Sequence, residues 1–476
     1  MASLRRLIPM HALRSTTGGS ILVLVAAVLL FVYPALAKKP VDPPFTARDP
    51  GIPPDSAPAG GSIIGLTRAE FAFFDIGRDD FIEVESVESG LGPRFNLGSC
   101  GGCHSQPATG GTSPFRNPQF FVATAGGAQD SVPFFITLDG PVREARFKFN
   151  PDGTRDGAVH NLFTITGRSG VSGCNIVQPD FDAAAKKNNL IFRIPTPVFG
   201  AGLIENIPDD VIIKNKNSHL FRKRSLGIDG HENRSGNDRS ITRFGWKAQN
   251  KSLLMFSGEA YNVEMGVTNE LFPQERDETP GCVLNPLPED TTNFTLDAVG
   301  TAVPSGIEKF AFFMRMLAPP MPAPDNPSRL NGRQLFDQIG CSLCHTPTLT
   351  TGNTAIAALS NQEVKLFSDL LLHRMGGLAD DIVQGNAGPD EFRTAPLWGI
   401  GQRIFFLHDG RTDDLLEAIR QHDSSRSEDR EGIKNFDFDE IWQHNSRRSE
   451  ARAVVKNFNA LTETEKQDIL NFLRSL

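Results

Sequence analysis

The feature that most constrains this chain is a short pattern, Cys-x-x-Cys-His, that occurs at Cys100–His104 and again at Cys341–His345. Two thiols three residues apart lie on one helical turn, where both can reach the vinyl groups of one porphyrin, and the following histidine can then ligate the iron. Four of the six cysteines of the 476-residue chain fall in these two units. The pattern predicts two covalently attached c-type haems, held by Cys100, Cys103, Cys341 and Cys344, with His104 and His345 as proximal iron ligands.

Three other kinds of site contain a Cys-x-x-Cys pair: a thioredoxin-like redox centre, a zinc site and a disulfide. A redox pair does not need the following histidine. A zinc site needs two further ligands at close spacing, and neither unit has them. Before the second unit, Leu335, Phe336 and Ile339 recur as on the buried face of a short helix that leads into an attachment site. These observations favour haem over the three alternatives.

The first 37 residues are typical of a cleaved secretory signal. Arginines precede an apolar run of twelve residues, 21–32, and Ala35-Leu36-Ala37 is a cleavage motif before Lys38. The run is short for a membrane span, so an uncleaved anchor is the less favoured alternative. Haem attachment to Cys-x-x-Cys-His takes place on the oxidising side of the membrane. Both features therefore predict a periplasmic protein.

The charge of the chain indicates what kind of partner it can have. The leader carries three arginines and no acid, so the net charge of −8 becomes −11 without it. This balance argues against nucleic acid and suits a redox partner with a basic docking patch. We expect that partner to be a small cytochrome or a cupredoxin, and we expect membrane contact only through an uncleaved signal.

The two remaining cysteines, Cys174 and Cys282, are free to pair in an oxidising compartment. We predict a disulfide between them. Two separate buried thiols are the alternative.

Helix-start signals and prolines divide the mature chain. Capping-box spacing at Thr67, Ser305 and Thr462 predicts three helix starts. Phe120–Val122 and Phe134–Ile136 are predicted strands in a loop-rich region. We predict a mainly α fold of two cytochrome c-like haem domains, the first with a loop-rich, partly β insertion. The predicted parts are a signal peptide at 1–37, an extended arm at 38–65, a first haem domain at 66–318, a Pro-rich linker at 319–328 and a C-terminal cytochrome c-like domain at 329–476.

The second axial position of each iron decides the function, because Met or His closes it for electron transfer and an open position allows small-molecule chemistry. Near the second unit, His373 and Met375 are candidate ligands, and His408 is a further histidine that could instead bond a turn or a haem propionate. For the first iron the candidate is Met265, since the adjacent glycine would admit a porphyrin; packing is the alternative. Five histidines in polar surroundings are predicted to lie at the surface: His160, His219, His231, His422 and His444.

Several segments together resemble one family, the di-haem oxidoreductases, also labelled thiol-oxidoreductase-like. The resemblance runs from about Leu66 to Leu476. Besides the two Cys-x-x-Cys-His units, the segments that carry it are GLIENIP (Gly202–Pro208), RFGWKAQ (Arg243–Gln249), GCSLCHTP (Gly340–Pro347), SDLLLHRMG (Ser368–Gly376), FRTAPLWG (Phe392–Gly399) and LHDGR (Leu407–Arg411).

This family is similar, more distantly, to bacterial di-haem cytochrome c peroxidases and their MauG-type relatives. In those peroxidases the C-terminal haem takes electrons from a donor and the N-terminal haem handles peroxide. Two departures separate this chain from them. Asp390 stands where the peroxidases have a methionine, and residues 105–121 contain no histidine to serve as a removable distal ligand. The peroxidases' ligand sets are therefore not carried over to this chain.

The residues and the resemblance together predict an exported di-haem c-type oxidoreductase that transfers electrons and is peroxidase-like. Work on peroxide needs an acid–base residue on the distal side of the first iron, and Glu205, Glu259 and Glu264 are the candidates. The alternative for each is an exposed or ion-paired glutamate. Two other functions remain open: a non-enzymatic electron carrier with both irons six-coordinate, and a haem-bearing binding protein of a metal-uptake or surface system.

Overall fold

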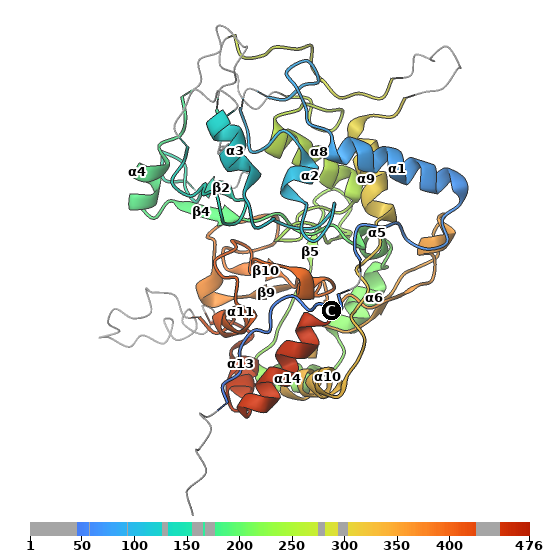
Figure 1. Cartoon of the computed structure of the whole chain (residues 1–476), viewed down its shortest axis with the longest axis vertical. Coiled ribbons are helices and arrows are strands. Elements are labelled where there is room, and N and C mark those ends of the chain that lie inside the picture. The colour runs from blue at the N-terminus through green and yellow to red at the C-terminus, as the bar shows by residue number, and fades with distance from the viewer. Residues whose placement is uncertain are drawn as a thin grey trace, which may run out of the picture. The chain divides into compact units, whose positions relative to one another are not determined.

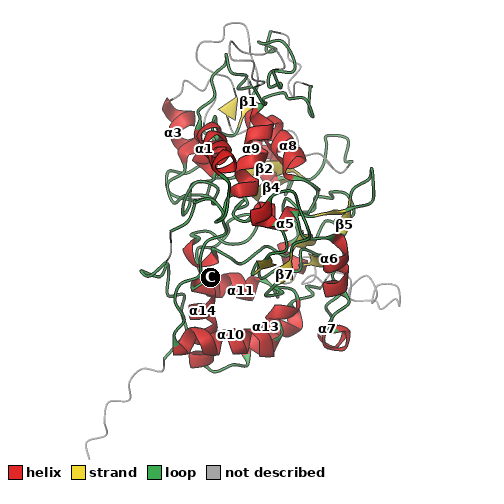
Figure 2. Cartoon of the chain, turned by 90° about the vertical axis from the view of Figure 1, so that its right-hand side faces the viewer, coloured by secondary structure: helices red, strands yellow, loops and turns green. Residues whose placement is uncertain are grey.

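Short helices joined by loops carry most of the regular structure (Figure 1, Figure 2). The computed structural model describes residues 45–56, 58–92, 94–125, 132–154, 165–166, 177–274, 281–293, 303–424 and 448–476, and from Thr46 onward they belong to one compact unit. The helices are α1 (Arg68–Ile82), α2 (Cys100–Cys103), α3 (Pro118–Ala125), α4 (Phe181–Lys186), α5 (Ala201–Glu205), α6 (Asp209–Lys216), α7 (Leu220–Leu226), α8 (Leu253–Met265), α9 (Gly306–Met316), α10 (Pro327–Ile339), α11 (Leu415–Gln421), α13 (Arg452–Asn459) and α14 (Glu463–Arg474). The strands are β1 (Arg94–Phe95), β2 (Glu144–Phe147), β3 (Ile165–Thr166), β4 (Leu190–Arg193), β5 (Asn233–Arg234), β6 (Ile241–Thr242), β7 (Leu349–Thr350), β8 (Glu363–Val364), β9 (Leu372–Arg374) and β10 (Glu391–Arg393).

Side-chain caps decide where several helices begin. Complete capping boxes at Thr67 and Thr462 start α1 and α14, which confirms both predictions. The predicted box at Ser305 is wrong, although α9 does begin there, because the Ser305 side chain makes no cap hydrogen bond. The carboxylate of Asp290 accepts hydrogen bonds from the backbone N–H groups of Gly306 and Ile307 instead, at 2.7 and 3.1 Å. A negative group at a helix N-terminus is also favoured by the helix dipole.

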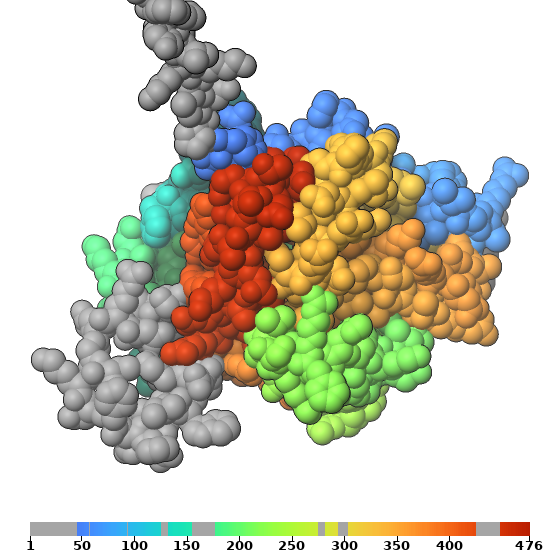
Figure 3. Space-filling view, turned by 90° about the horizontal axis from the view of Figure 1, so that it is seen from below, coloured from blue at the N-terminus to red at the C-terminus, as the bar shows by residue number. Residues whose placement is uncertain are grey.

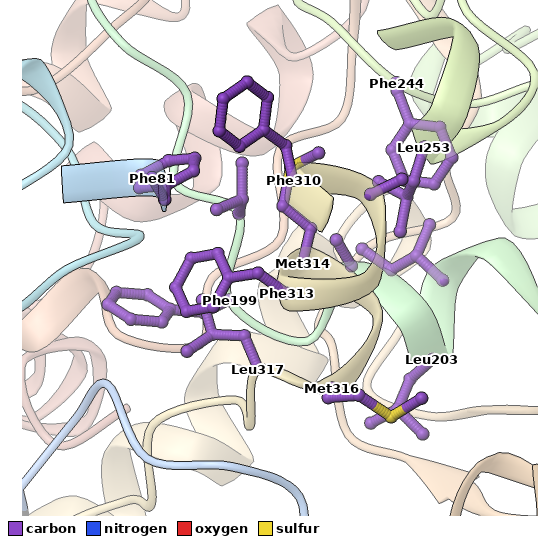
Figure 4. Close-up of a cluster of buried hydrophobic side chains, with 14 of the residues drawn as sticks. Phe81, Phe199, Leu203, Phe244, Leu253, Phe310, Phe313, Met314, Met316 and Leu317 are labelled. Atoms are coloured by element: carbon purple, nitrogen blue, oxygen red, sulfur yellow. The ribbon is translucent and has the colours of Figure 1, made fainter. Parts of the chain in front are cut away.

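The first hydrophobic core lies where α1, α8 and α9 pack together (Figure 4). Gly77 lets α1 approach α9 closely, because a Cβ at this position would lie 2.5 Å from the carbonyl oxygen of Lys309. Phe81 then packs on Phe313, with ring centroids 4.9 Å apart. Met314, which we predicted to be a core residue, is buried in this cluster. This core forms one wall beside the first Cys-x-x-Cys-His unit.

The second core is built by α10 and α14, which lie side by side (Figure 1, Figure 3). Contact is again made at a glycine, since a Cβ on Gly332 would meet the carbonyl oxygen of Asp468 at 1.9 Å. Phe336 on α10 packs edge-on against Phe472 on α14, with centroids 5.5 Å apart. The helix predicted before the second unit is therefore confirmed, together with its buried face of Leu335, Phe336 and Ile339.

Within the described residues, the strands form two-stranded antiparallel sheets: β1–β3, β2–β4, β5–β6, β7–β8 and β9–β10. The fold is thus helical with small sheets. The predicted strand at Phe120–Val122 is wrong, because this run belongs to α3. Pro118 suits the first helical position, and the Asn117 side chain accepts a hydrogen bond from the N–H of Gln119 at 2.9 Å. The predicted strand at Phe134–Ile136 is likewise a turn.

The arm before the first helix reaches the C-terminal helix. Asp49 forms an ion pair with Arg474 of α14 at 2.5 Å, and the backbone N–H of Ala47 donates to Glu463 at 2.8 Å.

The division into two haem domains and a proline-rich linker stays a prediction, as do the signal peptide and its cleavage. Among the described residues, no helix is both long and apolar enough to span a bilayer.

Candidate haem-binding sites

The second Cys-x-x-Cys-His unit opens onto a cavity of about 220 Å³. Gly340 ends α10 in the left-handed region, with φ of 108°, and a short 3-10 turn over Cys341–Leu343 follows. Cys341, Cys344 and His345 all line the cavity. The Nδ1 atom of His345 lies 3.1 Å from the carbonyl oxygen of Phe367. A proton on Nδ1 that is donated to this carbonyl leaves the Nε2 lone pair free for a metal.

The first unit repeats this arrangement in a cavity of about 150 Å³. Cys100 and Cys103 lie on α2, and the Nδ1 atom of His104 is 2.9 Å from the carbonyl oxygen of Gly111. Gly111 belongs to the glycine-rich loop after the unit. The two glycines between the cysteines lie in close quarters: a Cβ on Gly101 would lie 3.1 Å from the Cα of Ile82, and one on Gly102 would displace the Leu97 side chain.

The protonation states of both units suit iron ligation. Burial lowers the pKa of His345 to about 4 and also lowers the pKa of His104, so both imidazoles are neutral at pH 7. Burial raises the pKa of the Cys100 and Cys341 thiols to about 12. Two thiols and one neutral imidazole with an available nitrogen, beside a mainly apolar cavity, fit a covalently attached haem at each unit.

His373 lies at the second cavity, but other groups hold both of its ring nitrogens. Nδ1 is 2.7 Å from Glu450 and Nε2 is 3.0 Å from Asp369. Burial opposes the charged form, yet the sulfur of Cys344 and the carboxylate of Asp369 raise the pKa of His373 well above its usual value. An ion-paired imidazolium has no lone pair to offer a metal.

Met375 and His408 line the same cavity, and both pack at the hydrophobic cluster that contains Trp246 and Phe392. The His408 ring stacks on Phe392 with centroids 4.4 Å apart, and burial lowers its pKa to about 4. His408 is therefore neutral at pH 7. Of the histidines named for the second iron, it offers a free nitrogen and His373 does not.

His422 was predicted at the surface, and that prediction is wrong. Its side chain lines the second cavity, and its Nδ1 is 2.7 Å from the carbonyl oxygen of Ala418. The signal that could have placed it is helical spacing, because Leu415, Ala418 and Ile419 lie on one face of α11 and His422, its C-cap, continues that spacing. His231 is half-buried beside Glu391 at 3.0 Å. His160 and His444 lie outside the described residues.

The first cavity has a charged wall. Glu259 and Glu264, both predicted as acid–base candidates, line it together with Glu144 and Arg146. Glu264 accepts a hydrogen bond from Asn96 at 2.7 Å, and Glu259 accepts one from Asn250. Sequence reasoning missed Glu144 and Arg146. Their local signal was weak: β2 alternates charged and apolar residues along its sequence.

Arg146 is the centre of this charged wall. It is buried and forms an ion pair with Glu144 at 2.7 Å, but within the part of the chain that the structure describes its Nε and Nη1 atoms have no hydrogen-bond partner. Burial acts to lower the pKa of Arg146, but Glu144, Glu264 and Glu259 raise it overall. A cation that faces several carboxylates in one cavity can both orient a polar ligand and hold a proton source beside it.

The two other predicted site residues are placed differently. The Met265 sulfur lies 3.8 Å from the sulfur of Cys100, at the first cavity, and its role as a ligand of the first iron stays a prediction. Glu205 is not brought to either cavity. It forms an ion pair with Arg315 at 2.6 Å and accepts a hydrogen bond from the backbone N–H of Leu253 at 2.7 Å.

Trp246 lines both cavities. It lies in the segment Arg243–Gln249 and donates a hydrogen bond from Nε1 to the carbonyl oxygen of Ile194 at 2.9 Å. Ile194 in turn donates its N–H to the carbonyl oxygen of His408 at 2.8 Å. One aromatic side chain thus touches the surroundings of both Cys-x-x-Cys-His units.

Cys282 is fully buried and disulfide-bonded. Its predicted partner, Cys174, lies outside the described residues. Cys100, Cys103, Cys341 and Cys344 are free thiols, as attachment to haem requires.

Two cavities, each with paired thiols and a histidine and joined by a tryptophan, define a protein with two haem-type redox centres. A family model described as "Di-haem oxidoreductase, putative peroxidase" matches residues 170–439, more than half of the chain. The protein belongs to this family, which confirms the predicted resemblance and implies two haems and a haem-based redox function.

A search of solved structures returned the diheme peroxidase BthA from Burkholderia thailandensis. It is 17% identical to this chain, with a TM-score of 0.28, over 49% of this chain and 65% of that one. The match therefore spans less than two thirds of the length of BthA. A search of curated proteins returned no match.

Proposed function

We propose that this protein is an exported, periplasmic di-haem c-type oxidoreductase with covalently attached haems at Cys100–His104 and Cys341–His345. The observation that carries the proposal is the repeated geometry of the two units. In each, the histidine Nδ1 lies at a backbone carbonyl oxygen, at 2.9 Å in one and 3.1 Å in the other, and both thiols are free beside a cavity. When bound, the irons supply one-electron redox chemistry and, at an open axial position, a site for a small oxidant.

The second unit would be the electron-entry side. Its cavity has a mainly apolar wall, and Met375 and His408 stand at it as neutral groups able to fill an axial position. An axial Met or His closes such a site to substrates and leaves electron transfer as its function. The electron donor would be a small periplasmic cytochrome or cupredoxin.

Trp246 would join the two centres. Its indole is buried, contacts both cavities and is held by a hydrogen bond to Ile194. One side chain that lines both cavities would give electrons a continuous packed route between the two centres.

The first cavity would be the reactive side, with peroxide as the substrate class. Arg146 Nη1, which has no partner among the described residues, can donate a hydrogen bond to a peroxide oxygen. Glu144 binds Arg146 through Oε1, which leaves Oε2 to accept the peroxide proton and return it to the leaving oxygen. Glu259 and Glu264 line the same cavity, and their negative charges stabilise the Arg146 cation.

The second candidate function is a non-enzymatic electron carrier, and Met265 is the observation that favours it. Its sulfur lies at the first cavity, 3.8 Å from Cys100. A thioether that closed the first iron would leave both centres six-coordinate and would prevent peroxide from binding.

The oxidised-state spectrum of the purified protein separates the two functions. The oxidoreductase predicts one high-spin haem that responds to peroxide and cyanide and one low-spin haem that does not. Glu144→Gln and Arg146→Gln should slow the peroxide reaction by at least about tenfold. Glu205→Gln is the matched control, since Glu205 lies away from both cavities. Two low-spin haems that neither peroxide nor cyanide perturbs would rule out the peroxide reaction and support the carrier function.

A further inference from the structure

The second cavity contains two guanidinium groups that no carboxylate of the described residues neutralises. Arg403 lines it and is only 6% exposed, and among the described residues its Nε and Nη2 atoms have no hydrogen-bond partner. Arg393 lines it too, and its side chain donates hydrogen bonds to two backbone carbonyl oxygens, those of Gly245 at 3.0 Å and Thr394 at 3.4 Å. Neither arginine takes part in an ion pair within the described part of the chain.

Arg403 differs in this respect from the other buried arginines that the structure describes. Each of the others has a carboxylate partner. The pairs are Arg146–Glu144, Arg193–Asp380, Arg243–Asp209, Arg329–Asp55 and Arg474–Asp49. An uncompensated buried charge costs several kcal/mol, so an unpaired guanidinium is expected where an anion from outside the chain completes the pair.

The cavity offers no anion of its own for this purpose. Glu450 is the acidic residue among those that line it. Its carboxylate already forms ion pairs with His373 at 2.7 Å and with Arg374 at 3.1 Å. Burial lowers the pKa of both Arg393 and Arg403 to about 10, and no acidic neighbour offsets it. Both side chains thus lie in surroundings that lack a negative charge.

We propose that Arg393 and Arg403 bind the two propionate carboxylates of the haem attached at Cys341 and Cys344. The inference rests on the proposed function, because it requires that haem. A c-type haem keeps two carboxylates after both vinyl groups have reacted, and two guanidinium groups face the cavity. Guanidinium and carboxylate are matched in charge and in planar, paired hydrogen-bond geometry.

The pairing has a consequence for the redox chemistry. Positive charges at the propionates favour the reduced iron, which carries one positive charge less than the oxidised iron. Both arginines therefore raise the reduction potential of the second haem, which suits a centre that accepts electrons from a donor.

The test replaces each arginine by glutamine in the full holoprotein and measures both haem midpoint potentials by spectroelectrochemical titration. We expect two haems per chain in Arg403→Gln, a lower potential for one haem and an unchanged potential for the other. The propionate bending bands in the resonance Raman spectrum should shift as well. Arg393→Gln should affect the same haem, and Arg403→Lys, which keeps the charge, should lower the potential less.

Arg243→Gln is the matched control, because Arg243 is buried, bonded to Asp209 and absent from the lining of both cavities. It should lower thermal stability without moving either potential. If both glutamine variants bind two haems and show unchanged potentials and Raman bands, the propionate inference is wrong, while the proposed function still stands. If added acetate shifts a haem midpoint potential of the wild type, the arginines bind a soluble anion and not the propionates. A wild type without haem would overturn the proposed function itself.

Discussion

Arg193 and Asp380 form a buried ion pair that joins the surroundings of the two cavities. The guanidinium Nη2 lies 2.6 Å from the carboxylate, and the two side chains are 3% and 0% exposed. Arg193 lines the first cavity. Asp380 also binds the ammonium of Lys247 at 3.0 Å, and that ammonium lies 4.3 Å from the ring centroid of Phe392 at the second cavity.

Loss of the Asp380 carboxylate should destabilise the protein strongly. Asp380→Asn leaves Arg193 and Lys247 buried without a counter-charge, and breaking a buried pair in this way costs about 3–5 kcal/mol. Urea unfolding followed by far-UV circular dichroism measures the loss. Asp238→Asn is the control, because Asp238 pairs with Lys251 at the surface and should change stability little. Equal effects of the two substitutions would contradict this account of the ion pair.

The same carboxylate predicts an acid-sensitive stability. Burial acts to raise the pKa of Asp380, but Arg193 and Lys247 lower it from 3.8 to about 2 overall. A carboxyl whose folded-state pKa is depressed stabilises the fold fully above its unfolded pKa and stops doing so as the pH falls through the folded value. We expect a contribution of about 2 kcal/mol to be lost between about pH 4 and pH 2. Asp380→Asn should lack this part of the pH dependence. A stability–pH profile equal to that of the wild type would contradict this role of the Asp380 carboxylate.

Gly332 should tolerate no side chain. A Cβ there would overlap the backbone carbonyl of Asp468 at 1.9 Å, and α10 and α14 would have to separate. Gly332→Ala is expected to cost about 3 kcal/mol and to lower the yield of the second haem, because α10 leads directly into that unit. Gly236→Ala is the control, since nothing lies within 4 Å of a Cβ at that position. Melting temperature and haem content measure both variants.

Trp246 should control electron exchange between the centres. Trp246→Phe keeps an aromatic ring but removes the Nε1 hydrogen bond to Ile194, so the ring loses its fixed position between the cavities. Inter-haem transfer after rapid reduction of the second haem should slow by at least about tenfold, with both haems retained. The control is Trp398→Phe, which alters a buried tryptophan that lines neither cavity. Equal rates in the two variants would rule out a relay at Trp246.

The parts of the fold that sequence reasoning could predict depend on neighbouring residues. The helix into Cys341 and the capping boxes at Thr67 and Thr462 each need only a few adjacent positions, and all three are confirmed. The apolar run at Phe120–Val122 is too short for its period to separate helix from strand, and Pro118 was the signal that favoured a helix.

The candidate sites combine residues that are far apart in sequence, and this limited their prediction. Glu144 and Arg193 face each other across β2 and β4 only because those strands pair. His373 has the local sequence of a candidate ligand, but Glu450, which is distant in sequence, binds its Nδ1 atom in the fold. Arg403 has no local pattern that marks it, and its proposed role depends on the lack of a hydrogen-bond partner for its Nε and Nη2 atoms among the described residues.

Intact mass of the mature protein, produced with a c-type haem maturation system, tests the central claim most directly. The account predicts a polypeptide that begins at Lys38 and carries the added mass of two haems. Each double variant, Cys100→Ser with Cys103→Ser or Cys341→Ser with Cys344→Ser, should carry one haem. A wild-type mass equal to that of the bare polypeptide would contradict covalent attachment at both units.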